Sequence, residues 1–417
     1  MKKKRHRFLI HALSLTLTAA LLQPVTVAAT AEGQEAAAQT ESQDAAQSDL
    51  WPAAPEIVSP SAYLLEDTTG AVLFDQAGDE VRYPGSAVKI MTMLVALENS
   101  SLSDTVTFSQ TGVAAASGGA VNIAAQVGEE LTMEQCLYAI MLASANDVCV
   151  QVAEHVSGSV EAFVEQMNQK AAELGCTNTV FANPTGLHDE NQHSTAHDLA
   201  LIMQAAIENE TFRTISSAVS YTIPATNMTA SPRNLTDSFP LSAQNSTSLY
   251  EGILAGKTGY TQASGSTLVT AAERNGTLLI AVVLMGTTAQ TPADAMNLLD
   301  YGFQNFQRVQ YSDADATLSG GYAMLPTGVT LNQIQVTENQ TEEGIAQEYY
   351  YQDHLIGRGV IQAQTQEASP TPTAIDNAEY LQTLNQEKSP VPYFIICGAG
   401  AVILLLLALL LVKVIRS

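Results

Sequence analysis

The sequence predicts an α+β fold in which an antiparallel sheet is flanked by helices, and three observations lead to this prediction. Asn275-Gly276 separates two strand-like runs, 266–273 and 278–284, and this dipeptide is a strong signal for a β-hairpin. A helical pattern over 293–306 follows and would pack on that sheet. The run from Ile90 to Leu97 has no helix breaker and is apolar on every side, which is typical of a buried helix.

Both ends of the chain have the features of membrane-targeting segments. Residues 1–31 begin with a basic stretch, continue through an apolar run and end in small residues, as a secretory signal peptide does. Residues 393–412 contain no charge and are long enough to span a bilayer as a transmembrane helix. Lys413 and Arg416 follow, so residues 413–417 are expected to be cytoplasmic. The part of the chain between these segments is then expected to be exported and tethered to the cell membrane. The alternative, that residues 393–412 form a helix of the protein core, is disfavoured because they follow a polar linker at the end of the chain.

The charge of the exported part excludes one class of partner. The formal net charge is −25, with five of the 17 Lys and Arg residues in 1–31 and two after residue 412. Residues 32–412 therefore hold 10 basic against 42 acidic residues, and such a surface repels phosphate backbones. We therefore expect no nucleic acid as a partner.

The exported part is expected to contain a larger domain, residues 55–306, and a small β module, residues 307–364. A polar, disordered spacer (32–54) precedes them, and a Gln-, Thr- and Pro-rich linker (365–392) follows. Turn, capping and periodicity signals place the elements of the larger domain. In chain order these are a hairpin around 67–70, the central helix 86–99, a helix opened by a capping box at 132–135 and ending near 144–147, helices 148–156, 159–174 and 196–208, strand-and-turn material over 219–250, and a strand containing Lys257.

The start of the central helix carries a serine and a lysine with complementary chemistry. Ser86 and Lys89 are three residues apart, so they share one face across the first turn. The helix dipole and partial burial should lower the pKa of Lys89, which lets part of it act as a base. A serine hydroxyl is a poor nucleophile until a neighbour takes its proton. Alone, the pair also fits a polar helix start with a lysine that reaches to solvent.

Two further motifs follow in order. Ser144-x-Asn146 lies near a helix end, and Lys257-Thr258-Gly259 lies on or beside a strand next to the hairpin. Singly, these also fit a helix C-terminal cap and an edge-strand gatekeeper. Together with Ser86-x-x-Lys89, they form the motif set of penicillin-binding proteins and class A β-lactamases.

The chain resembles that superfamily and, more narrowly, the low-molecular-mass penicillin-binding proteins that are serine-type D-alanyl-D-alanine carboxypeptidases. The similarity covers about residues 55 to 305 and is looser beyond them. It extends through Tyr83-Pro84-Gly85-Ser86, Ser144-Ala145-Asn146-Asp147, Asn183-Pro184-Thr185-Gly186-Leu187, Ser194 to Ala200, Lys257 to Thr261 and Leu298 to Phe303. The resemblance implies a penicillin-binding transpeptidase/β-lactamase-like domain, with a helical subdomain and the site between sheet and helices.

The resemblance also implies catalytic roles for four side chains. Ser86 would attack the carbonyl between the two D-alanines of a peptidoglycan stem peptide, with Lys89 as its base. Ser144 would relay a proton to the leaving D-alanine, and Asn146 would hold Lys89 and the substrate. Water would then hydrolyse the acyl-enzyme. β-Lactams should acylate Ser86 and leave slowly, and neither a cofactor nor a metal is implied.

Substrate binding would fall to the Lys257–Thr261 segment. The resemblance implies that Lys257 adds positive potential, that Thr258 and Thr261 meet the terminal carboxylate, and that Gly259 belongs to this binding strand. The backbone N–H groups of Ser86 and Tyr260 would form the oxyanion hole.

One departure from the family concerns carboxylate recognition. Many members carry an arginine in the loop before the segment corresponding to 298–303, but residues 286–295 contain none. Either the threonines bind the carboxylate alone, or Arg274 approaches from the neighbouring hairpin.

Three other functions share features with this one. A class A β-lactamase would need a glutamate, within an E-x-x-L-N motif, to activate the deacylating water. The most similar segment begins at Glu165, but it lacks the Leu-Asn pair. A D,D-endopeptidase or transpeptidase differs only in the bond cut or the acceptor. A non-catalytic wall-binding protein is disfavoured because the motif set is intact.

The remaining cysteines and histidines suggest no metal site. The cysteines of the body have no C-x-x-C spacing and are expected to be buried small hydrophobes. His193 precedes the cap of a predicted helix and His197 lies within it, so the two are not expected to share a face. The cysteines are Cys136, Cys149 and Cys176.

Overall fold

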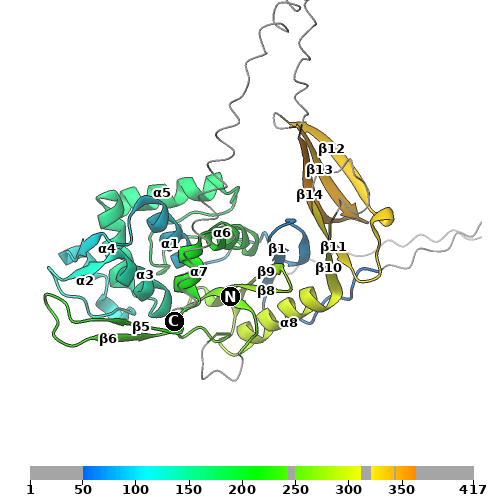
Figure 1. Ribbon diagram of the computed structural model, residues 1–417. Helices are drawn as coiled ribbons and strands as arrows, with labels where there is room; N and C mark the ends of the chain where they lie inside the picture. Colours follow the sequence, from blue (N-terminus) through cyan, green and yellow to red (C-terminus); the bar gives the residue numbers. More distant parts are fainter. Residues whose placement is uncertain (1–49, 243–248, 311–320, 342–343, 363–417) are drawn as a thin grey trace, which may run out of the picture. The chain divides into compact units, whose positions relative to one another are not determined.

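The computed structural model describes residues 50–242, 249–310, 321–341 and 344–362 (Figure 1). The predicted signal peptide, the linker and the predicted transmembrane helix over 393–412 lie outside these residues. Within the described ranges, no helix combines the length and the apolar character needed to cross a membrane.

A five-stranded antiparallel sheet forms the centre of the larger domain. Its strand order is β2-β1-β9-β8-β7. The strands are β1 (Ser61–Glu66), β2 (Val72–Gln76), β7 (Ile253–Thr261), β8 (Gly265–Arg274) and β9 (Thr277–Gly286). Both predicted hairpins are confirmed, and the Asn275-Gly276 turn has positive φ at both residues, as a tight two-residue hairpin requires.

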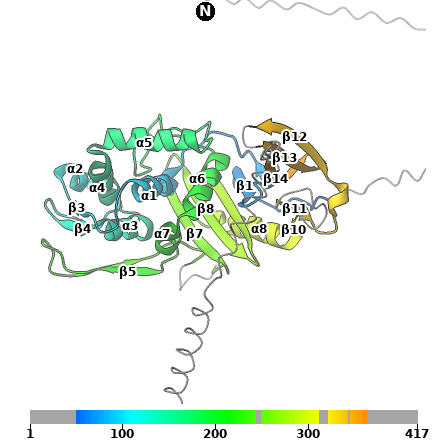
Figure 2. The same cartoon turned by 45° about the horizontal axis from the view of Figure 1, so that its top comes forward.

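Both faces of the sheet are buried, and β9 shows this in its alternation. Ile280, Val282 and Leu284 pack into the core shared with the helical part, whereas alternate residues pack against α8 (Gln290–Asn305). Figure 2 shows α8 beside the sheet strands. The helix begins three residues earlier than predicted, because Pro292 in its first turn breaks no hydrogen bond that this turn would make.

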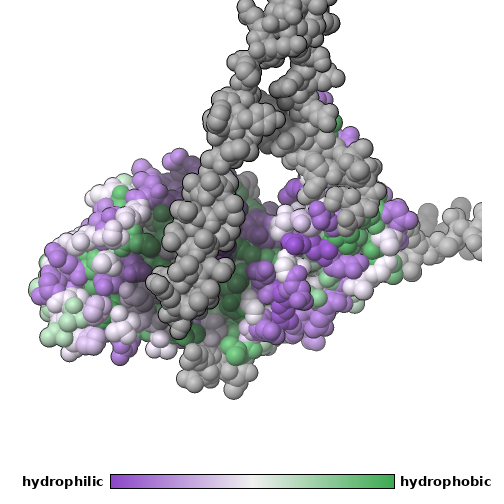
Figure 3. Space-filling view, in the orientation of Figure 1, coloured by the Kyte–Doolittle hydropathy of each residue, from purple (hydrophilic) through white to green (hydrophobic). Residues whose placement is uncertain are grey.

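A helical subdomain packs against the other face of the sheet. Its elements are α1 (Val88–Asn99), α2 (Gln110–Ala114), α3 (Met133–Leu142), α4 (Asn146–Ser157), α5 (Val160–Glu173), α6 (Ala196–Glu208), α7 (Glu210–Ser216), and the two-stranded pairs β3 (Thr105–Thr107) with β4 (Glu130–Thr132) and β5 (Ser220–Ile223) with β6 (Arg233–Thr236). The predicted capping box at Thr132 and the cap of α6 at Thr195 are confirmed. Helix α1 is buried from Val88 to Ala96, as its uniformly apolar sequence predicted. The surface of this part mixes hydrophilic and hydrophobic residues (Figure 3).

The small β module is a second antiparallel sheet. Its strand order is β10-β11-β14-β13-β12. The strands are β10 (Phe306–Gln310), β11 (Tyr322–Pro326), β12 (Gln335–Thr341), β13 (Gly344–Tyr351) and β14 (His354–Gln362). Trp51 packs its ring edge-on to Phe306 and stacks on His354, with ring centroids 5.1 and 3.6 Å apart.

Candidate active site

Ser86 lies in a short 3₁₀ turn, η1 (Gly85–Ala87), that leads directly into α1 and packs against β7. The packing is close, because a Cβ atom added to Gly259 would lie only 2.4 Å from the backbone nitrogen of Ser86. The Thr267 hydroxyl on β8 donates to the carbonyl oxygen of Pro84 at 3.1 Å. The glycine of the Lys257-Thr258-Gly259 motif therefore allows the strand to approach the backbone of the serine.

Lys89 is completely buried one turn after Ser86. Its ammonium donates to Ser86 Oγ at 3.3 Å, to Asn146 Oδ1 at 2.8 Å and to the backbone oxygen of Thr185. Burial lowers the pKa of Lys89. The predicted direction is confirmed, although burial is complete rather than partial. Lys89 thus has the geometry of a base beside the serine hydroxyl.

The Thr185 carbonyl is a functional group that sequence reasoning missed. It lies in the loop 183–186, where Asn183 Oδ1 accepts hydrogen bonds from the Thr185 backbone, the Thr185 hydroxyl and the Gly186 backbone. The Thr92 hydroxyl, one turn after Lys89, donates to Pro184 O at 2.7 Å. The Asn-Pro-Thr-Gly sequence predicts a turn. It does not predict which backbone carbonyl will accept a hydrogen bond, because every residue carries one.

Ser144 and Asn146 lie at the junction of two helices. Helix α3 ends at Leu142, Ser144 takes the left-handed conformation with φ 55°, and Asn146 begins α4. Asn146 is therefore not part of a C-terminal cap, and its side chain points to Lys89 instead. The strained backbone at Ser144 is of the kind that occurs at functional sites.

Lys257 is buried on β7 although β7 is an edge strand. Burial, and then the nearby charge of Lys89, lower the pKa of Lys257 to about 7. A gatekeeper lysine would face solvent, so that alternative interpretation is wrong.

Ser86, Ser144 and Lys257 line one cavity of about 440 Å³, and Lys89 and Asn146 are bonded behind Ser86. Its lining is rich in hydroxyl groups and contains no Asp or Glu from the part of the chain that the structure describes. The lining residues are Ser86, Val121, Ser144, Ser238, Pro240, Lys257, Thr258, Gly259, Tyr260, Ser266, Leu268, Thr288, Thr291 and Pro292. Such a site suits a substrate that carries its own negative charge near the bond to be cut.

Thr261 and Arg274, the two further candidates for binding the substrate carboxylate, lie outside the cavity. The Thr261 hydroxyl bonds with that of Ser264 at 2.9 Å, and Thr261 is not part of the cavity lining. Arg274 lies at the end of β8 remote from Ser266, where it stacks over Tyr250 at 4.2 Å. It also donates to the carbonyl oxygen of Glu251 at 3.2 Å. The idea that Arg274 replaces the missing arginine is therefore wrong.

The residues on which the β-lactamase and metal-site hypotheses depend also lie outside the cavity lining. Glu165 is exposed on α5. His197 bonds to Asp79 at 3.0 Å, and His193 contacts the carbonyl oxygen of Asn191. The three cysteines predicted to be buried are buried and free, which confirms that prediction.

Comparison with known proteins identifies the family and the fold. Residues 48–288 match the S11 peptidase family, described as D-alanyl-D-alanine carboxypeptidase. D-alanyl-D-alanine carboxypeptidase DacF of Bacillus subtilis is 34% identical over 255 residues, which are 59% of this chain and 62% of that protein. Penicillin binding protein 6B from Escherichia coli has a TM-score of 0.62 and 26% identity, over 75% of this chain and 97% of its own. The Streptomyces K15 DD-transpeptidase has a TM-score of 0.57 and 30% identity, over 61% and 100%.

The fold and the site together define a class of protein. The antiparallel sheet with its helical subdomain is the fold of the penicillin-binding, transpeptidase-like serine enzymes. The serine bonded to a buried lysine fits the S-x-x-K motif of that class. Within that class, the chain belongs to the family of serine-type D-alanyl-D-alanine carboxypeptidases.

Proposed function

We propose that this protein removes the terminal D-alanine from peptidoglycan stem peptides that end in D-Ala-D-Ala, and that β-lactams inhibit it by acylating Ser86. One observation carries the proposal. The Lys89 ammonium contacts both Ser86 Oγ and Asn146 Oδ1, and Ser86 lines the same cavity as Ser144 and Lys257. This arrangement supplies a nucleophile, a base and a positive field for the substrate carboxylate.

The first half-reaction forms an ester. Neutral Lys89 takes the proton of Ser86 Oγ as that oxygen attacks the carbonyl carbon between the two D-alanines. The backbone N–H groups of Ser86 and Tyr260 stabilise the developing oxyanion. When the C–N bond breaks, a proton passes through Ser144 to the leaving D-alanine amine, and the acyl group stays on Ser86.

The second half-reaction hydrolyses the ester and regenerates the free Ser86 hydroxyl. Water attacks the ester carbonyl, loses a proton to Lys89, and Ser86 leaves as the alcohol. In the region described by the structure, no carboxylate lines the cavity to activate this water. When Ser86 attacks a β-lactam, the C–N bond of the ring breaks, but the released amine stays attached to the acyl group and remains in the site. The ester should therefore persist on Ser86 for a long time, which disfavours a β-lactamase.

Carboxylate recognition without arginine is assigned to Lys257 and to hydroxyl groups. Thr258, Ser266 and Thr288 line the same cavity as Lys257. A charged lysine with neighbouring hydroxyl donors provides charge-assisted hydrogen bonds to a carboxylate.

The proposed location is the outer face of the cell membrane. The support is in the sequence, through the signal-like residues 1–31 and the uncharged stretch 393–412. A second candidate activity is D,D-transpeptidation, which one observation favours. The Streptomyces K15 protein, whose whole length is matched, is a DD-transpeptidase by name. D,D-endopeptidation, which cuts a different bond with the same groups, is a further alternative.

The test uses purified residues 32–390. We expect D-alanine release from a pentapeptide ending in D-Ala-D-Ala, and a stable penicillin adduct that mass spectrometry maps to the peptide containing Ser86. Adduct formation without D-alanine release would favour the second candidate. Absence of both would contradict an enzymatic function.

We predict a bell-shaped pH profile for kcat/KM with the peptide substrate. Lys89 has to be neutral to accept a proton, so activity is lost as pH falls through its lowered pKa. Lys257 has to be protonated to attract the carboxylate, so activity falls by about tenfold per unit as pH rises above its pKa of about 7. In Lys257→Arg, the guanidinium stays charged, and the alkaline limb should move to higher pH. An unchanged alkaline limb in that variant would rule out Lys257 as its source.

A further inference from the structure

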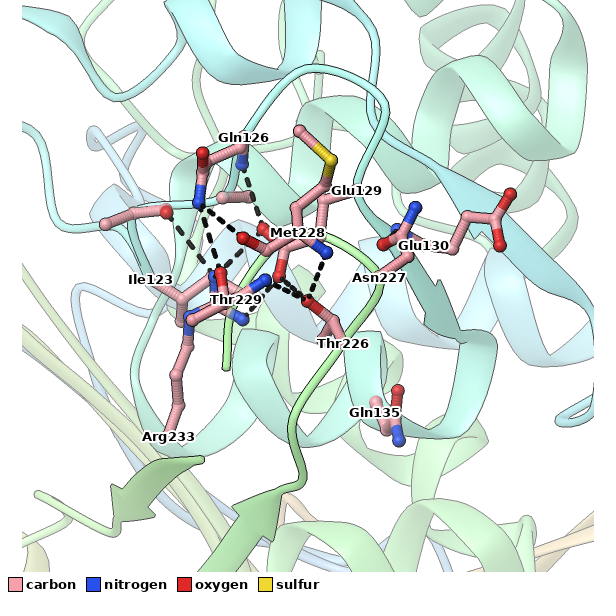
Figure 4. A network of polar contacts seen from close by, with 12 residues as sticks. Ile123, Gln126, Glu129, Glu130, Gln135, Thr226, Asn227, Met228, Thr229 and Arg233 are labelled. Atoms are coloured by element: carbon pink, nitrogen blue, oxygen red, sulfur yellow. Dashed lines mark hydrogen bonds and ion pairs between the residues drawn. The ribbon is translucent and has the colours of Figure 1, made fainter. Parts of the chain in front are cut away.

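Outside the catalytic groups, the fully buried carboxylate of Glu129 is the centre of a polar network (Figure 4). Arg233 donates to both of its carboxylate oxygens, at 2.7 and 2.9 Å. The Thr226 hydroxyl donates at 2.6 Å, and the backbone N–H of Gln126 donates at 2.9 Å. These donors and the adjacent guanidinium lower the pKa of Glu129 below its usual range, against the effect of burial.

Further hydrogen bonds join the same two chain segments. Asn227 donates from its side chain to Gly128 O at 2.8 Å and accepts from the Glu130 backbone at 2.9 Å. The Gln126 side chain donates to the Thr229 hydroxyl at 3.2 Å. We call this set of contacts, between residues 126–130 and residues 226–233, the clasp. It joins the turn before β4 to the connection between β5 and β6.

On one side, the clasp continues directly into a wall of the active-site cavity. Val121, in the same loop, lines the cavity and accepts a hydrogen bond from the Asn146 backbone at 2.8 Å. The backbone N–H groups of Ile123 and Ala125 donate to the Asp147 carboxylate. The loop that Glu129 holds is therefore bonded to the first residues of α4, and Asn146 in turn contacts Lys89.

On the other side, the clasp leads into a second segment of the cavity lining. Strand β6 begins at Arg233 and ends at Thr236, and Ser238 and Pro240 follow in the lining. The Asp237 carboxylate fixes this turn by accepting from the Phe239 backbone at 2.9 Å. Val121 and Ser238 are exposed parts of the lining, so they can meet substrate groups remote from the bond that is cut.

We propose that the Glu129–Arg233 clasp is a positioning device that sets the spacing between these two cavity walls. It thereby selects peptides long enough to contact both. The inference rests on the proposed function, because it concerns substrates of the same cavity. An ion pair with two parallel hydrogen bonds to a fully buried carboxylate suits this task, since its fork geometry fixes orientation as well as distance. A lysine at position 233 would keep the charge but lose the paired hydrogen bonds.

The experiment compares kcat/KM for a pentapeptide and for an N-acylated D-Ala-D-Ala dipeptide, in the protein as purified and in Arg233→Gln. We expect the ratio of the two values to fall by about tenfold, mainly through KM for the pentapeptide, since small misplacements of binding groups have effects of this size. Arg233→Lys should restore part of the ratio. Asn227→Ala, which removes two clasp hydrogen bonds without leaving a buried charge, should lower the ratio by a smaller factor of about three.

A matched control removes an ion pair remote from the clasp. Lys170 on α5 contacts Glu98 at 2.9 Å and Glu173 at 3.2 Å, and Lys170→Gln should leave the ratio unchanged. The proposal is overturned if Arg233→Gln and Asn227→Ala are folded by circular dichroism and both keep the original ratio. Equal losses for the two substrates would also overturn it, because they would indicate only general destabilisation. Failure of the unvaried protein to cleave either substrate would refute the proposed function instead.

Discussion

Replacing Lys89 by methionine is expected to slow the acylation of Ser86 by about 10³- to 10⁴-fold, the upper range for removing a general base. The ammonium contacts the Ser86 hydroxyl at 3.3 Å, and the structure shows no other basic side chain bonded to that hydroxyl among the residues it describes. The loss should appear equally with the peptide and with penicillin, since both acylate the same oxygen. Rapid-quench mass spectrometry of the penicillin adduct measures the step directly.

The same substitution should change the free energy of unfolding only slightly. Asn146 Oδ1 and Thr185 O lose a donor, which costs about 1–3 kcal/mol for each buried acceptor left unpaired. In the opposite direction, the variant no longer buries the group whose pKa is lowered by desolvation. Because these contributions oppose each other, the thermal midpoint should stay close to that of the unvaried protein.

The control for this prediction uses the second lysine. Lys89 contributes to the lowered pKa of Lys257, so Lys89→Met should shift the pKa of Lys257 upward toward its usual value. Ser86→Ala removes the nucleophile but keeps Lys89, and should leave the pKa of Lys257 low. Acylation in Lys89→Met within tenfold of the unvaried rate would show that another group accepts the serine proton.

The sequence predicted those parts of the site that depend on short spacing. Ser86 and Lys89 share a helical turn, so three residues of separation sufficed to predict their contact. Asn146 was placed by resemblance, and the structure brings it within hydrogen-bond distance of Lys89 from 57 positions away. The caps of α3 and α6 were readable because the capping side chain and its target are three residues apart.

What the sequence did not predict depends on long-range geometry. Glu129 and Arg233 are 104 positions apart and have no local pattern that pairs them. Arg274 was considered near the site because its hairpin neighbours it, but β8 runs from Gly265 to Arg274, about 30 Å at the usual rise per strand residue. The sequence placed Arg274 in the hairpin next to the strand that carries Lys257, but it did not indicate at which end of the hairpin, near the site or remote from it, the side chain lies.

Gly186→Ala is expected to lower kcat/KM by about 100-fold, since shifts near 1 Å at a catalytic group can have this effect. A Cβ atom at position 186 would lie 2.0 Å from Gly85 O and 2.9 Å from Ser86 Cα. Both neighbours are backbone atoms, so no side-chain rotation relieves the contact. Either the turn that carries Ser86 or the loop that carries the Thr185 carbonyl has to move, and each holds one partner of Lys89.

Gly175→Ala provides a control with the same backbone conformation. Both glycines have φ +79°, so alanine at either position incurs the left-handed penalty of about 1–2 kcal/mol. No atom lies within 4 Å of a Cβ placed on Gly175, so that variant should lose only this stability and keep its activity. Measuring the thermal midpoint and kcat/KM for both variants separates the cost of backbone strain at the substituted position from the displacement of the Ser86 turn. Equal activity of Gly186→Ala and Gly175→Ala would contradict this prediction. It would mean that the loop and the Ser86 turn can shift without disturbing the contacts of Lys89. The close packing of these two segments would then not be required for catalysis.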